Sequence, residues 1–364
     1  MAEKYGRIKN RHRWSTGFLQ LLFWVLFFYF SLELKLYQAV EGLFYNRELI
    51  FGLYILLITL IYFSYSTIFS YVFHYRRERR FDLSSQTSGA WLVDTVKSFV
   101  LNFVILLLMS RFLFYLINYR PDFWWLYWAA GVSLFTVLLT FILPKILLPF
   151  FFELTEYPSG ELRDRLMAFI NRLDINVEEI YEINLSSKIN YANAAVVGLG
   201  QTRRILLGDN LSEKYTPAEI EAVLAHELAH HVHGDVIKNI LLEPFIFTLC
   251  SGAVFFFWPY VGSLFSYSDP ALYTLPLLMI FWGMIYGLFQ PLQLYLSRKY
   301  ERRADRFACE KIEEPRNFAS ALARLADESL QRLDYSWYQL LFSASHPPPG
   351  ERVRQALDKN KTSK

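Results

Sequence analysis

Two histidines and a glutamate near the middle of the chain have the residue types and the spacing of a catalytic metal site. Residues 225–230 read Ala-His-Glu-Leu-Ala-His. On a helix, His226 and His230 lie on one face, so both imidazoles can reach one ion. Glu227 lies beside them, where it can take a proton from a water molecule without being a ligand. The pattern therefore predicts hydrolysis assisted by a zinc ion.

A third ligand must come from elsewhere, because catalytic zinc usually has three protein ligands and one open position. Glu301 and Asp305 lie four residues apart in an Arg-rich segment. Glu301 can bind the ion, and Asp305 can accept a hydrogen bond from the far nitrogen of a ligand histidine. A surface helix of ion pairs is the alternative for this segment. His231 and His233 are expected at the surface or as supports rather than as ligands, since adjacent helical positions are rotated by about 100°.

The helix that carries the histidines has a clear start signal. Thr216 is expected as the N-cap, Pro217 as the first helical residue, and Glu219 completes a capping box. The helix is expected over residues 217–235, and an earlier one over 154–174. Strand-like segments cover residues 177–185, 193–197 and 204–207. They predict a small sheet of three or four strands.

Six apolar stretches are long enough to cross a bilayer, which takes about 20 helical residues. They cover residues 18–40, 49–73, 96–118, 123–144, 240–265 and 270–297. Hydrophobic residues make up 54% of the 364-residue chain, which fits long spans combined with a polar domain. The net charge of +3, without a basic face of interleaved aromatics, does not indicate a nucleic-acid partner.

Lys and Arg are unevenly distributed among the segments that connect the spans. They are concentrated before the first span, between the second and third, and after the sixth, while the other short connections are nearly free of them. This alternation predicts that the N-terminus and the catalytic domain are cytoplasmic. The bacterial cytoplasmic membrane is favoured over the endoplasmic reticulum.

The expected fold class is a mostly α, polytopic membrane protein with about six transmembrane helices and a small α+β zinc-peptidase domain. Four regions are expected along the chain. Residues 1–152 hold four membrane helices, 153–238 the sheet and the histidine helix, 239–297 a membrane hairpin, and 298–364 the third ligand. The hairpin would return the chain to the side of the membrane where the two histidines lie.

With these residues, the chain resembles the type I CAAX prenyl protease family of integral-membrane zinc metalloendopeptidases. The resemblance extends over nearly the whole chain in matching order and spacing. Besides the metal motif and the Glu301/Asp305 pair, it rests on residues 81–87 with Trp91, Asp94 and Lys97, on 144–151, 160–163, 193–194 with Gly198, 204–207 with Asp209, and on 345–347 followed by Glu351 and Arg352. The chain departs from the family at Ala229, where Gly is usual, and at Ala195, where an aromatic residue is usual.

The resemblance implies a gluzincin-like domain with a short sheet whose edge is exposed. It implies one Zn²⁺ ion bound by His226, His230 and Glu301, with Glu227 as the general base. Asp305 would orient a ligand histidine.

It also implies roles for residues outside the metal motif. Arg352 would brace the region of Asp305, and His346 would help to stabilise the oxyanion of the reacting carbonyl. Asn193, Ala194 and Ala195 would lie on the edge strand that pairs with an extended substrate, because an exposed edge offers unpaired backbone groups.

The expected partners are the lipid bilayer and a peptide or protein substrate, with or without a prenyl group or membrane anchor. CAAX-type prenylated C-termini and membrane proteins under quality control are both candidates. A transporter with a regulatory metal site is one alternative, but it predicts charges along several spans, and chiefly Arg111 lies within one. A catalytically silent metal scaffold is another, which Glu227 argues against because structural zinc needs no general base.

Overall fold

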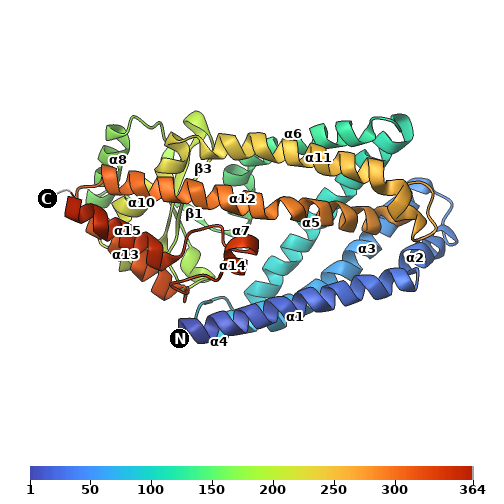
Figure 1. Ribbon diagram of the computed structural model, residues 1–364, viewed down its shortest axis with the longest axis horizontal. Helices are drawn as coiled ribbons and strands as arrows, with labels where there is room; N and C mark the ends of the chain where they lie inside the picture. The colour runs from blue at the N-terminus through green and yellow to red at the C-terminus, as the bar shows by residue number, and fades with distance from the viewer. Residues whose placement is uncertain (363–364) are drawn as a thin grey trace.

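The computed structural model describes residues 1–362, and Figure 1 shows a bundle of long helices joined at one end to a polar domain. Within these residues, five helices are long and apolar enough to cross a membrane, and a bent pair makes up to six. The long helices are α1 (Ala2–Tyr29), α2 (Leu32–Glu41), α3 (Arg47–Phe69), α5 (Ser88–Tyr119), α6 (Trp124–Ile142), α11 (Asp235–Ser263) and α12 (Leu275–Lys311). The expected class, a mostly helical membrane protein with a small sheet, is confirmed.

The first expected span is a bent pair of helices rather than one straight helix. The axes of α1 and α2 differ by 55°. Ser31, at the break, has a φ of 48°, a left-handed conformation that no helix continues through. Past the bend, Glu33 is fully buried and accepts a hydrogen bond from Tyr267. The carboxylate of Glu33 therefore lies against Tyr267 of the same chain and not against lipid.

Short elements follow α3 and α6 where those helices reach the polar end. The chain continues through η1 (Ser70–Tyr75) and α4 (Arg76–Arg80) after α3, and through η2 (Leu143–Leu147) and α7 (Leu148–Phe151) after α6. Both η elements are π-helical turns. Each π-helical turn lies between a long helix and the short segment that leads into the polar end of the molecule.

The polar domain contains a four-stranded sheet. Its strands are β1 (Leu154–Glu156), β2 (Glu179–Ile183), β3 (Ala194–Val197) and β4 (Arg204–Gly208), in the order β1-β2-β4-β3. β2 and β4 are parallel, and the other two pairs are antiparallel. Residues 154–156, expected in a helix, form β1 instead, because they pair with β2 and Pro158 disfavours helix in the residue before it. The helix α8 (Glu161–Arg172) starts only afterwards.

Six further helices, from both halves of the chain, belong to the polar domain. They are α8, α9 (Asp209–Lys214), α10 (Pro217–Val232), α13 (Pro315–Glu328), α14 (Trp337–Phe342) and α15 (Pro349–Thr362). One core joins Ile205 of the sheet, Leu224 of α10 and Phe318 of α13, each at most 1% exposed. The C-terminal part of the chain therefore shares one hydrophobic core with residues 154–232. In Figure 1, α12 runs from the far end of the bundle into this domain.

The helix expected over residues 217–235 is two helices. α10 ends at Val232, and α11 begins at Asp235. Gly234 lies between them with a φ of 66°, the left-handed conformation in which glycine commonly ends a helix. Because of this break, the side chain of Asp235 reaches His230 on α10.

Candidate metal centre

The start of α10 has the cap expected from the sequence. The hydroxyl of Thr216 accepts from the backbone N–H of Glu219 at 3.3 Å, and Oε2 of Glu219 accepts from the backbone N–H of Thr216 at 2.9 Å. Glu219 also accepts from Ser320 and Arg324 of α13. The cap therefore fixes both the start of the helix and its docking to the C-terminal half.

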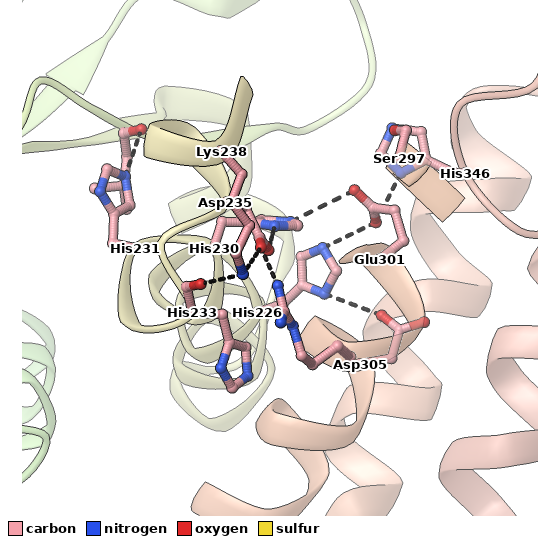
Figure 2. A network of polar contacts seen from close by, with 12 residues as sticks. His226, His230, His231, His233, Asp235, Lys238, Ser297, Glu301, Asp305 and His346 are labelled. Carbon is pink, nitrogen blue, oxygen red and sulfur yellow. Dashed lines mark hydrogen bonds and ion pairs between the residues drawn. The ribbon is translucent and has the colours of Figure 1, made fainter. Parts of the chain in front are cut away.

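Three potential ligands converge between α10 and α12, as Figure 2 shows. Ligand atoms of His226, His230 and Glu301 all lie within 4.8 Å of one another. Nε2 of His226 is 3.2 Å from Oε2 of Glu301, and Nε2 of His230 is 3.4 Å from Oε1. A tetrahedral zinc ion with ligands at about 2.1 Å would hold those atoms about 3.4 Å apart. The donor set and its spacing therefore fit zinc.

Two further observations indicate that this cluster suits a cation. Oε2 of Glu301 is buried and has no hydrogen-bond partner among the described residues, although histidine nitrogens lie close to it. Burial alone would lower the pKa of His226, but its contacts with Asp305 and Glu301 raise that pKa to about 9. The carboxylates thus outweigh burial and favour positive charge at this point.

A carboxylate from α12 supports the first histidine. Nδ1 of His226 is 2.9 Å from Oδ1 of Asp305, an ion-pair contact that is not aligned as a hydrogen bond. Arg352 of α15 donates two hydrogen bonds to Asp305, at 2.8 and 2.7 Å. We call His226, Asp305 and Arg352 the long-range arm, because its aspartate and its histidine are far apart in the sequence. The structure brings together the residues that the resemblance implied here.

A second carboxylate supports the other histidine, and the sequence analysis missed it. Nδ1 of His230 is hydrogen-bonded to Oδ2 of Asp235 at 3.1 Å, and Asp235 is 2% exposed. Arg303 of α12 donates to its other oxygen, and Nζ of Lys238 lies 3.5 Å from that oxygen. We call His230, Asp235 and Arg303 the local arm. In the sequence, the only indication of this contact is that Gly234, a residue that commonly ends a helix, directly precedes Asp235.

Glu227 follows His226 on α10 and interacts electrostatically with both histidines. It remains partly exposed to solvent, while Glu301 and both supporting aspartates are buried. Burial raises the pKa of Glu227 above its ordinary value, although His226 and His230 act in the opposite direction. A carboxylate with a raised pKa is better able both to accept and to return a proton near neutral pH.

His346 reaches the cluster from the segment between α14 and α15. Its Nδ1 is 2.8 Å from Oε2 of Glu301, and 55% of its side chain is exposed. Two residues at the end of the last span hold this segment: Ser297 donates to the carbonyl of Ser345 at 2.9 Å, and Arg298 to that of Ala344 at 2.6 Å. The backbone just before His346 is therefore held to α12, while its ring contacts Glu301 and is half-exposed to solvent.

The strand with the expected substrate-binding residues is at the edge of the sheet. Ala194 and Ala195 lie in β3, which pairs only with β4, and Asn193 directly precedes it. The carbonyl of Asn193 accepts from the backbone N–H of Gly208. Val196, which the sequence analysis did not single out, is hydrogen-bonded through its carbonyl to His231 of α10.

Comparisons with known proteins identify the family of this chain. Residues 156–360 match the family model for peptidase family M48, and residues 1–153 match a model described as the CAAX prenyl protease N-terminal region with five membrane helices. The uncharacterized metalloprotease YhfN of Bacillus subtilis is 29% identical over 286 residues, which are 76% of this chain and 66% of that protein. The human CAAX prenyl protease 1 homolog is 27% identical over 327 residues, which are 77% of this chain and 67% of that protein.

A solved structure shares the fold. The crystal structure of S. mikatae Ste24p superposes on this chain with a TM-score of 0.85 at 20% sequence identity. The superposition covers 98% of this chain and 87% of the Ste24p chain. The M48 match alone covers more than half of the 364 residues. The chain therefore belongs to peptidase family M48 and is a membrane metalloendopeptidase.

Proposed function

We propose that this protein is a zinc endopeptidase in which His226, His230 and Glu301 hold one Zn²⁺ ion and Glu227 is the general base. The observation that carries the proposal is the convergence of three potential ligand atoms within 4.8 Å of one another. The carboxylate of Glu227 is close enough to interact electrostatically with both histidines. Two imidazoles and one carboxylate are a ligand set that suits catalytic zinc and would leave its fourth position open for water. The four sequence regions given above are proposed as its membrane and catalytic parts.

A zinc ion held by His226, His230 and Glu301 would lower the pKa of water and polarise the scissile carbonyl. Glu227 takes the proton from the attacking water and delivers it to the leaving amine, which its raised pKa assists. His346 turns from Glu301 to donate a hydrogen bond to the oxyanion. Asp305 keeps His226 in the orientation that presents Nε2, and Arg352 keeps Asp305 in place.

We further propose that the substrates are membrane-associated peptides, with CAAX-type prenylated C-termini as the first class to test. The names of the relatives and the matching N-terminal membrane region support this choice. The basic residues of α1 and α4 lie at the same end of the bundle as the polar domain, which supports a cytoplasmic site. A bacterial cytoplasmic membrane is the proposed location.

The test uses the purified full-length chain in detergent and an internally quenched, farnesylated peptide. Cleavage should stop with a chelator and return with zinc. Glu227→Gln should lower kcat by about 10²- to 10⁴-fold while the zinc content, measured by mass spectrometry, stays at one ion. Equal cleavage by Glu227→Gln and the unchanged chain would refute the assignment of the general base.

A further inference from the structure

The outward-facing backbone groups of the edge strand can be identified from its pairing. In an antiparallel pair, residues alternate between those that exchange hydrogen bonds with the partner strand and those whose N–H and C=O point away. The bond from Gly208 N–H to the carbonyl of Asn193, at 3.0 Å, places Asn193 in the first class. The register then turns Ala195 toward β4 as well, and turns Ala194 and Val196 toward the free edge.

One of these outward groups is already engaged by a side chain from the histidine helix. Nε2 of His231 lies 3.2 Å from the carbonyl oxygen of Val196, and Arg203 Nε donates to Nδ1 of the same ring at 3.3 Å. A guanidinium can only donate, so Nδ1 is the acceptor and the proton of the neutral ring is on Nε2. The two contacts therefore fix one tautomer, which donates to Val196.

The position of His231 separates it from the metal site. Figure 2 shows its ring directed away from Glu301, on the opposite side of α10 from the three potential ligands. The ring thus links α10 to the edge strand without contacting the metal site. Just beyond β3, Gly198 has a φ of 84°, and a Cβ there would lie 2.3 Å from the carbonyl oxygen of Thr202. The strand therefore ends in a tight turn soon after Val196.

We propose that His231 is a specificity-determining residue that limits how far a substrate can pair with β3. The inference rests on the proposed function, in which this edge binds the substrate backbone. With the carbonyl of Val196 occupied, the edge offers the N–H and C=O of Ala194 and the N–H of Val196. A substrate can then donate one backbone N–H to β3, where it could otherwise donate two.

A scan of N-methylated peptides tests this limit. Each peptide carries one N-methyl group in place of one backbone N–H, with the scissile amide left unchanged, and kcat/KM is compared with that of the unmodified peptide. For the wild-type chain, one position should be sensitive and lose about tenfold. For His231→Ala, a second sensitive position should appear two residues away, because the freed carbonyl of Val196 then accepts from the substrate.

Two variants serve as controls. Gln places an amide N–H close to where Nε2 of histidine lies, so His231→Gln should restore the wild-type pattern of one sensitive position. His233→Ala, which removes a nearby ring that contacts Phe307 and not β3, should leave the pattern unchanged. Each variant is compared with itself on modified and unmodified peptides, so a general loss of activity does not alter the result.

Two results would overturn the inference. One is a pair of sensitive amides two residues apart in the wild-type chain, and the other is a single sensitive amide in His231→Ala. A wild-type scan in which peptides are cleaved but no amide is sensitive would instead remove the edge strand from the proposed function, and this inference with it. Absence of zinc-dependent cleavage would refute the proposed function itself.

Discussion

The long-range arm and the local arm give the two histidines the same support from different parts of the chain. In each, an aspartate contacts Nδ1 of the ring, and an arginine holds the aspartate. The long-range arm joins α10, α12 and α15, whereas the aspartate of the local arm is five residues from its histidine. The histidine and aspartate come from distant segments in the long-range arm and from one local turn in the local arm, while both arms take their arginine from a distant helix.

The histidine and the arginine of the long-range arm are more buried than those of the local arm, while both aspartates are almost fully buried. The side chain of His226 is 8% exposed against 20% for His230, and that of Arg352 is 13% exposed against 32% for Arg303. A charge left without its partner costs more where water cannot reach it. We therefore expect the long-range arm to affect both metal binding and stability, and the local arm to affect mainly metal binding.

Removal of the aspartate from the long-range arm should have the largest effect. Asp305→Ala removes both hydrogen bonds of the buried Arg352 and leaves it with the Glu301 carboxylate at 3.7 Å, which should lower the free energy of unfolding by about 3 kcal/mol. It should also weaken zinc binding by about 10- to 100-fold, because the His226 ring loses its orienting partner. Thermal unfolding of the metal-free protein in detergent and a zinc titration measure the two effects. An unchanged unfolding temperature without metal would contradict this account of the arm.

The matching change in the local arm should separate the two effects. Asp235→Ala should weaken zinc binding by a similar factor of about 10 to 100, since His230 loses the same kind of partner. It should cost only about 1–2 kcal/mol of stability, because Arg303 and Lys238 are partly exposed and can be solvated. The same two measurements apply. A loss of stability as large as that of Asp305→Ala would show that the arms are equivalent.

The sequence predicted the parts of this site that depend on local spacing. The histidine motif, the Thr216/Glu219 cap and the four-residue step from Glu301 to Asp305 each follow from helical geometry. Asp235 could not be found in this way, because the expected helix continued to it. On a continuous helix, position 235 is rotated by about 140° from the face of His230, and only the turn at Gly234 brings it back.

The other features that the sequence did not predict depend on contacts between segments that are distant in the sequence. β1 has three residues and is stabilised only by pairing with β2, so nothing local distinguishes it from the start of a helix. The contact of His231 with Val196 depends on how the strand lies beside α10, which no spacing in the sequence gives. The six apolar stretches were recognised from composition, while the bend at Ser31 was not.

Exchange of arginine for lysine tests how the aspartates are held. Arg352 makes two hydrogen bonds to Asp305, a geometry that one ammonium group cannot reproduce, so Arg352→Lys should cost about 1.5–3 kcal/mol. Arg303→Lys should cost less than about 1 kcal/mol, because a lysine can maintain the contact with Asp235. Thermal unfolding of both variants side by side gives the comparison, and equal losses would mean that the paired geometry adds nothing.

Removal of Lys238 should have the smallest effect on zinc affinity. It tests whether Asp235 supports His230 through the balance of nearby charges or through its hydrogen bond to Nδ1. Its Nζ lies 3.5 Å from Asp235, and 45% of its side chain is exposed. An exposed pair of this kind contributes at most about 1 kcal/mol and is screened by salt. Lys238→Ala should therefore change zinc affinity by less than about fivefold, with any difference disappearing at 0.5 M salt. A salt-sensitive loss as large as that of Asp235→Ala would mean that Asp235 acts on His230 through the charge balance around it. A small loss would leave the hydrogen bond to Nδ1 as the basis of its effect.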